Sequence, residues 1–181
     1  MATVRQLEHR DHTPSRQPHP LVLLLNDIKL PVNVGSLFRL SDALGIEKLY
    51  LTGQTPTPPN RKIRKTSRAT ENYVPYEYTA NAQTVIATLK QQGYTLIALE
   101  ITSHSVNLES LDYARFAKMC LILGAEDSGI DAALLSTAHH TVHIPMAGRN
   151  SSMNLVAACA IAAHRITTIK QQTDAQSGRR A

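Results

Sequence analysis

Aromatic residues are scarce in this chain of 181 residues, which has no Trp, two Phe and six Tyr. The core must therefore be built from aliphatic side chains: Leu, Ile, Val and Ala. The scarcity also argues against RNA binding through platforms of exposed aromatic rings, on which bases would stack. The hydrophobic fraction of 43% and the charged fraction of 18% are ordinary for a globular protein of one domain.

Cysteine is also sparse, with only Cys120 and Cys159 in the chain. Two cysteines give no disulfide framework and no C-x-x-C spacing of a zinc site. Both lie in apolar surroundings, so we expect small buried hydrophobes. His139, His140 and His143 are close in sequence, but no fourth ligand is evident and their segment runs into a strand. We therefore expect no metal site.

Both ends of the chain lack hydrophobic periodicity. Residues 1–20 are polar, rich in His and Pro, and predict a flexible N-terminal arm, and residues 171–181 predict a disordered tail. Residues 21–170 form the expected folded domain. Because no segment reaches membrane-spanning length and the N-terminus has no hydrophobic signal core, we expect a cytoplasmic protein with no membrane partner.

Short apolar runs alternate with helix-like segments through the folded part. We expect strands at residues 21–25, 48–52, 95–100, 118–123 and 141–144, and helices at 33–44, 81–92, 132–138 and 152–168. Residues 53–80 contain several prolines and are expected to be irregular. The alternation predicts an α/β fold with a mostly parallel sheet flanked by helices.

The net charge of +5 fits a polyanionic partner, although a solvated basic surface is the simpler explanation. Much of the charge lies in one run of residues after the second expected strand. We interpret this run as an RNA-binding loop that contacts phosphates, joined by Arg149; its basic residues are Arg61, Lys62, Arg64, Lys65 and Arg68.

Ligands of such sheets bind beyond the carboxyl ends of the strands, where three segments rich in Gly, Asn or Ser fall. In the first segment, Asn33 is a candidate helix cap and Gly35 permits close approach of backbone or ligand. Arg39 lies one turn further on, outside the helix's leucine stripe. It is either a functional cation or a surface residue paired with Asp42 or Asp27.

The second segment, Gly124 to Gly129, brackets two acidic residues directly after an apolar strand. It is no phosphate-binding loop, because Glu126 and Asp127 would repel phosphate. It suits a cation or a ligand with amines or hydroxyls. The alternative is a tight turn in which Asp127 or Ser128 caps the next helix.

The third segment, residues 144–154, follows a strand and precedes the long C-terminal helix. Ser151 and Ser152 are natural caps for that helix. Asn154 is an amide early in an otherwise Ala-rich apolar helix and needs hydrogen-bond partners, so it is a candidate functional residue. The alternative is local capping.

Together the three segments resemble the motifs of the SpoU/TrmH branch of the SPOUT methyltransferases, over roughly residues 20–168. Asn-x-Gly-x-x-x-Arg is matched by Asn33, Gly35 and Arg39, and Gly-x-Glu-x-x-Gly by Gly124, Glu126 and Gly129. The third motif is matched by Ile144, Pro145, Met146, Gly148, Ser152 and Asn154. Met153 stands where Leu is usual, a replacement that preserves volume, and Val156 and Ala157 stand where Ser and Val are common.

The resemblance implies methyl transfer from S-adenosylmethionine to a ribose 2′-hydroxyl of RNA, without a metal. It implies a deep C-terminal trefoil knot, from about residue 121 to 163, and a homodimer with the site near its interface. It assigns cofactor binding, by position, to Leu99, Gly124, Ile144, Met146 and Met153. It assigns catalysis to Arg39, oriented by Asn33, Glu126, Ser152 and Asn154. The RNA is tRNA or rRNA, with tRNA slightly preferred.

Two questions stay open at this point. A guanidinium is a poor base, so Arg39 either loses its proton with help from a substrate phosphate or stays charged and stabilises the developing alkoxide. The main alternative function is a catalytically silent RNA-binding protein of the same fold. A Rossmann-type enzyme would need a Gly-x-Gly loop after the first strand, which this chain lacks, and the basic loop argues against a small-molecule substrate.

Overall fold

The computed structural model describes residues 5–6, 11, 13 and 18–177, so most of the predicted N-terminal arm lies outside the described residues. The described chain folds around one seven-stranded sheet with the strand order β3-β2-β1-β6-β4-β7-β5. All of its strand pairs are parallel. The strands are β1 (His19–Asn26), β2 (Ile46–Thr52), β3 (Tyr76–Thr79), β4 (Tyr94–Leu99), β5 (Val106–Asn107), β6 (Lys118–Leu123) and β7 (His140–His143).

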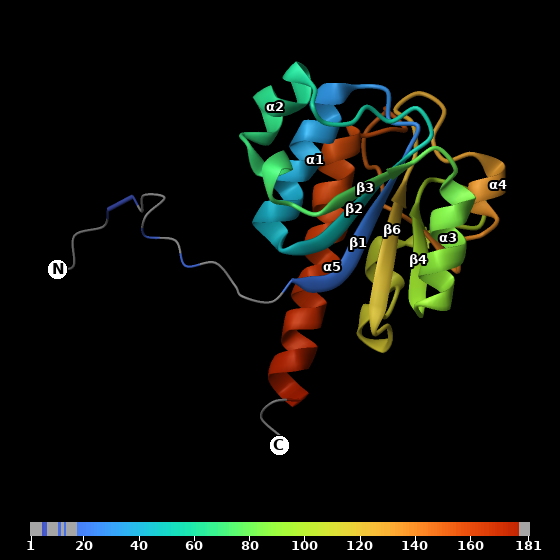
Figure 1. The fold of residues 1–181 in the computed structure, drawn as a ribbon. Coiled ribbons are helices and arrows are strands. Elements are labelled where there is room, and N and C mark those ends of the chain that lie inside the picture. Colours follow the sequence, from blue (N-terminus) through green and yellow to red (C-terminus); the bar gives the residue numbers. More distant parts are fainter. Residues whose placement is uncertain (1–4, 7–10, 12, 14–17, 178–181) are drawn as a thin grey trace.

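Helices cover both faces of the sheet (Figure 1). One face packs against α1 (Pro31–Leu44), α2 (Arg61–Ser67) and α5 (Leu155–Ser177). The other packs against α3 (Ala82–Gln91) and α4 (Ala132–Leu135). Residues 18–177 also contain three short 3-10 turns: η2 (Thr70–Asn72), η3 (Leu108–Ser110) and η4 (Tyr113–Arg115). The predicted α/β fold with a parallel sheet is confirmed.

The central strand β1 explains why the first apolar run is continuous. Leu21, Leu23 and Leu25 belong to the core under α1 and α5, whereas Val22 and Leu24 belong to the core under α3 and α4. Side chains of a strand alternate between faces, so a strand covered on both faces must be apolar at every position. Burial of Cys120 and Cys159 in these cores raises the pKa of both thiols, to about 12 for Cys159, as befits unreactive packing residues.

The prediction that residues 53–80 are irregular is wrong. The basic run forms the helix α2, capped by Asn60, whose side chain accepts hydrogen bonds from the N–H groups of Lys62 and Ile63. Strand β3 follows and pairs with β2. No apolar periodicity marks α2, because Ile63 is its one buried hydrophobic residue, so its cap was the available signal.

The C-terminal helix also differs from its prediction. It begins at Leu155 rather than Ser152 and continues to Ser177. Residues 171–177 are therefore helical and not part of a disordered tail, while 178–181 lie outside the described residues. Within residues 18–177, no helix has the length and apolar character needed to cross a membrane; the cytoplasmic location stays a prediction.

Gly35 allows α2 to lie directly on α1. A Cβ at this position would stand 2.1 Å from Thr66 Oγ1 and 2.4 Å from the carbonyl oxygen of Ile63. Thr66 Oγ1 also donates to the carbonyl oxygen of Val32 at 3.0 Å, which fixes α2 against the first turns of α1. The sequence predicts that backbone or a ligand approaches Gly35 closely, and in the structure it is the neighbouring helix α2 that does so.

Gly35→Ala tests this contact. Helix propensity alone would make alanine stabilising by about 1 kcal/mol. We expect the opposite, a loss of about 1–3 kcal/mol in the free energy of unfolding, because the backbone of α2 must shift. Gly148→Ala is the matched control, since a Cβ there meets nothing within 4 Å. Urea denaturation measures both, and a stabilised Gly35→Ala variant would contradict the packing argument.

Candidate functional site

A cavity of about 910 Å³ lies at the carboxyl edge of the sheet. Its walls come from the segments that follow β4, β6 and β7, together with the start of α1. Here β6 adjoins β1 although β2 and β3 lie on the other side of β1. The chain order therefore reverses at this point, which is where open parallel sheets bind ligands.

All but one of the predicted cofactor-binding and catalytic residues meet in this cavity. All five predicted cofactor residues line it: Leu99, Gly124, Ile144, Met146 and Met153. Four of the five predicted catalytic residues also line it: Asn33, Glu126, Ser152 and Asn154. Arg39 does not. The structure thus brings together nine residues from four parts of the chain: α1, the end of β4, the loop after β6 and residues 144–154. Their roles remain predictions.

Glu126 joins the second segment to the start of α1. One carboxylate oxygen accepts a hydrogen bond from the N–H of Lys29 at 2.8 Å, and the other accepts from the N–H of Leu30 at 3.2 Å and the Asn33 amide at 2.7 Å. Partial burial would raise the pKa of Glu126, but these hydrogen bonds more than offset it and hold the pKa below its usual value. The carboxylate is also favoured by the positive end of the α1 dipole.

Asn33 is not the helix cap that the sequence predicts. The helix α1 begins two residues earlier, at Pro31, and its N-cap is Leu30, which makes no side-chain cap. Asn33 is buried and its amide donates to Glu126 instead. The amide therefore supports the acidic side chain that faces the cavity.

Asn154 caps a helix, which is the alternative to a functional role that the sequence left open. Its Oδ1 accepts from the N–H groups of Val156 at 3.0 Å and Ala157 at 3.2 Å, so it caps α5 while lining the cavity. Ser151 and Ser152 are not the caps. The Ser152 hydroxyl and N–H both donate to Asn150 Oδ1, which shapes the loop before the helix.

The acidic segment after β6 is compact because two glycines touch. A Cβ on Gly124 would lie 2.2 Å from the carbonyl carbon of Gly129, and the N–H and C=O groups of Ala125 and Gly129 bond to each other. Neither Asp127 nor Ser128 caps the next helix, since Asp131 caps α4. Asp127 instead pairs with Lys29 at 2.5 Å on the surface, an interaction that lowers its pKa.

Arg39 lies outside the cavity, on the exposed face of α1. Neither predicted ion-pair partner holds it: Arg39 forms no hydrogen bond or ion pair with any described residue, Asp27 and Asp42 included. It stands one helical turn after Gly35, on the side of α1 that carries α2. Its guanidinium is therefore free to meet a group from another molecule.

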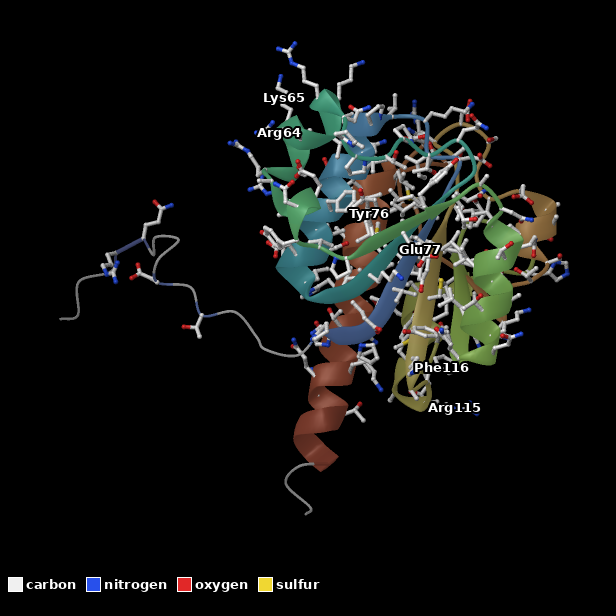
Figure 2. The ribbon with its side chains drawn as sticks, in the orientation of Figure 1. Arg64, Lys65, Tyr76, Glu77, Arg115 and Phe116 are labelled. Carbon is white, nitrogen blue, oxygen red and sulfur yellow. The ribbon has the colours of Figure 1, made fainter. Side chains whose placement is uncertain are left out.

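The basic residues of α2 are all exposed, and none forms an ion pair with a described acidic residue. Figure 2 shows Arg64 and Lys65 pointing into solvent at one end of the molecule, with Arg115 at the opposite end. Arg149 is separate from this helix. It lines a smaller hollow of about 330 Å³, which shares His143 and Ile144 with the cavity.

The three histidines face three different partners. The N–H of Leu96 donates to His139 Nδ1 at 2.8 Å, the ring of His140 lies against Phe116, and His143 Nδ1 bonds the Ser105 hydroxyl at 2.9 Å. Among the described residues, no three His, Cys, Asp or Glu side chains are grouped as a metal site would require.

Sequence reasoning missed several residues of the cavity, in particular Glu100, Ile101, Thr102 and His143. All follow the carboxyl end of a strand or close it, so strand position was the signal that could have found them. The charged residues of the lining are Glu100, Glu126 and Asp127, and neither Lys nor Arg contributes to it. The cavity therefore favours a cationic ligand over an anionic one.

The parallel α/β fold with a cavity at the carboxyl edge of its sheet is typical of a ligand-binding α/β protein. Comparison with known protein families identifies which one. The model of the SpoU rRNA Methylase family matches residues 20–164. The chain belongs to this family, which confirms the SpoU/TrmH membership predicted from its motifs.

Relatives with assigned substrates cover most of this chain. The tRNA (guanosine(18)-2'-O)-methyltransferase of Escherichia coli (strain K12) is 27% identical over 146 residues, which are 81% of this chain and 62% of that protein. The 23S rRNA (guanosine(2553)-2'-O)-methyltransferase of Bacillus subtilis (strain 168) is 27% identical over 145 residues, 80% of this chain and 57% of that protein. The chain thus spans about three fifths of the length of these relatives.

Solved structures agree. The AdoMet-bound rRNA methyltransferase from Sinorhizobium meliloti has 26% identity and a TM-score of 0.77, covering 91% of this chain and 61% of that one. The A. aeolicus TrmH/SpoU tRNA modifying enzyme has 21% identity and a TM-score of 0.78, covering 88% of this chain and 79% of that one. The second likeness shows a shared fold alone.

Glu126→Gln tests the contact between Glu126 and α1. Because the pKa of Glu126 is lower in the folded than in the unfolded state, its ionised form stabilises the fold above the unfolded pKa. That contribution is lost as the pH falls through the folded pKa. We expect the variant to lose about 1 kcal/mol of unfolding free energy at neutral pH, a modest value for an exposed carboxylate.

The deficit of Glu126→Gln should shrink in acid, below about pH 4, where wild type also loses the ionised form. Urea denaturation at both pH values measures it. Glu77→Gln is the control, because Glu77 makes only an exposed ion pair with Lys48. A Glu126→Gln deficit that is the same at both pH values would refute the charge-assisted role.

Proposed function

We propose that this protein is an S-adenosylmethionine-dependent methyltransferase that acts on a ribose 2′-hydroxyl of tRNA or rRNA. One observation carries the proposal. Among the described residues, the charged side chains that line the cavity of the three motif segments are all acidic, while the unpaired cations lie outside it on α1 and α2. A cationic sulfonium suits the first environment and a polyanion suits the second. Family membership and the substrates of the relatives support the same reaction.

The residues present fit the cofactor. Leu99, Ile144 and Met146 give the cavity apolar walls for a flat heterocycle, and Gly124 lets backbone groups reach its polar edge. When bound, S-adenosylmethionine supplies a methyl group on a positively charged sulfur, so alignment with the acceptor oxygen sets the rate. Glu126, Ser152 and Asn154 line the same cavity and are placed to orient the ribose. No residue need bind a metal for this transfer.

Arg39 takes the catalytic role in this proposal. It stays charged and stabilises the alkoxide that develops on the 2′-oxygen, since guanidinium is a poor base. Its position outside its own cavity fits a homodimer in which the exposed face of α1 meets the cavity of the second copy. The assembled Asn33, Glu126 and Asn154 disfavour a catalytically silent RNA-binding protein.

A deep trefoil knot from about residue 121 to 163 is part of the proposal. Strand β6 lies between β1 and β4, and β7 lies on the far side of β4. The chain therefore passes β4 in both directions before α5 returns to pack against α1. A knot would hold the segments that line the cavity together without a disulfide or other cross-link.

Arg39→Ala tests the catalytic assignment. Purified protein is incubated with tritiated S-adenosylmethionine and total RNA from cells that lack this gene. We expect labelled 2′-O-methylnucleoside from wild type and a loss of at least about 100-fold in the variant. Cofactor affinity should change little, because the change leaves all five proposed cofactor-binding residues in place.

Arg115→Ala is the matched control, an exposed arginine at the opposite end of the sheet (Figure 2). The size of the labelled RNA on a gel distinguishes tRNA, the RNA that we expect, from rRNA. Cofactor binding without label from wild type would favour the silent RNA-binding protein. An Arg39→Ala variant that is fully active would remove Arg39 from the mechanism.

Arg64→Ala and Lys65→Ala test the basic helix. Each is expected to weaken RNA binding and to lower the dependence of log K on log salt by about one unit, the signature of one lost phosphate contact. Fluorescence anisotropy with labelled RNA over a salt series measures this. Arg115→Ala should leave the slope unchanged. If Arg64→Ala and Lys65→Ala also keep the slope of wild type, α2 is a solvated surface that contacts no phosphate.

A further inference from the structure

Glu100 is the first residue after β4 and lines the cavity, but it is not among the residues proposed to bind the cofactor or the ribose. Its Oε1 accepts a hydrogen bond from the N–H of Ile101 at 2.9 Å, and its Oε2 accepts from the N–H of Ile130 at 3.1 Å. Its own N–H donates to the carbonyl oxygen of Val142 at 2.9 Å. One residue therefore contacts the ends of β4 and β7 and the loop after β6, the three segments that wall the cavity.

The absence of a side chain at Gly129 leaves room for the Glu100 carboxylate. A Cβ there would stand 2.4 Å from Glu100 Oε2, and the residue has a φ of +68°, which favours glycine. Gly129 in turn touches Gly124, whose missing Cβ leaves room for it. The chain of contacts runs from Glu100 through Gly129 to Gly124, so the carboxylate fixes the separation of two cavity walls.

A carboxylate of this length reaches the N–H groups of Ile101 and Ile130 at the same time. Each of its oxygens accepts one backbone N–H, and charge-assisted bonds of this kind are stronger than neutral ones. Glutamine keeps the size but replaces one acceptor by an NH₂ donor, which would face a backbone N–H. One of the two bonds would then be lost: the bond to Ile101 within the segment after β4, or the bond to Ile130 that ties the loop after β6 to β4.

We propose that Glu100 is a positioning residue for the methyl donor, which holds the loop of residues 124–130 against the end of β4 so that the cofactor-binding backbone is preformed. The inference rests on the proposed function, since it concerns the same cavity. Glu100 acts through Ile130 and Gly129, with both oxygens already bonded to the protein. It is no ligand of the reacting atoms.

Glu100→Gln is the first test, with Glu77→Gln as the control on an exposed strand carboxylate that Figure 2 shows on β3. Calorimetric titration with S-adenosylmethionine should give a Kd raised about tenfold in Glu100→Gln, the effect of one lost charge-assisted bond. At saturating cofactor, kcat should stay within about twofold of wild type. Glu77→Gln should match wild type in both.

Gly129→Ala is the second test, and it keeps the inference open to refutation if Glu100→Gln folds poorly. It leaves Glu100 in the chain but pushes its carboxylate aside, so it should also raise the Kd for S-adenosylmethionine. Gly93→Ala is the matched control, because Gly93 has a similar φ of +80° and a Cβ there meets nothing within 4 Å. In a Glu100→Ala background, Gly129→Ala should add little further loss, since the clash is gone.

The outcomes separate the two proposals. Unchanged cofactor Kd in Glu100→Gln and Gly129→Ala, with wild type binding well, overturns the role of Glu100 and leaves the methyltransferase intact. A lower melting temperature with unchanged Kd does the same, because it marks a merely structural contact. Wild type that fails to bind S-adenosylmethionine refutes the proposed function itself, and the inference falls with it.

Discussion

The contact on which the site depends is the one between Glu126 and the first residues of α1. A carboxylate that follows β6 accepts hydrogen bonds from two backbone N–H groups and from the Asn33 amide. It fixes where α1 begins relative to the loop after β6, and therefore where Asn33, Arg39 and Gly35 lie. The second motif thus positions the first, and through Gly35 and Thr66 it also positions the basic helix α2.

This arrangement separates charges of opposite sign on one small domain. The acidic residues that line the cavity lie at the carboxyl edge of the sheet, whereas the cations of α2 lie on the outer side of α1. Charge therefore attracts a polyanion to α2 more than to the cavity, and a cationic ligand in the cavity lies among acidic side chains. The two partners of a methyl transfer to RNA would each find an environment of complementary charge.

Sequence reasoning located the strands because buried parallel strands are continuously apolar, as in Leu21 to Leu25. It located three segments of the site because they follow those strands, and the family resemblance assigned the individual residues. It could not find their partners: Asn33 and Glu126 are 93 positions apart, and local capping also explained Asn33 and, in the second segment, Asp127 or Ser128. It missed α2 because one buried residue, Ile63, leaves no periodic pattern, and it missed Glu100 because a lone acid after a strand carries no motif.

The motif glycines show what kind of constraint the sequence pattern records. At Gly35, Gly124 and Gly129, the atom that a side chain would meet belongs to the protein itself: the backbone of α2, the neighbouring glycine, or the Glu100 carboxylate. The spacing of these glycines therefore reports how closely the supporting segments pack. Because interiors are close-packed and transmit displacement, a change in these supports would alter the cavity without touching its ligand. The specificity of the site would then lie as much in the contacts behind its walls as in the residues that face the cavity.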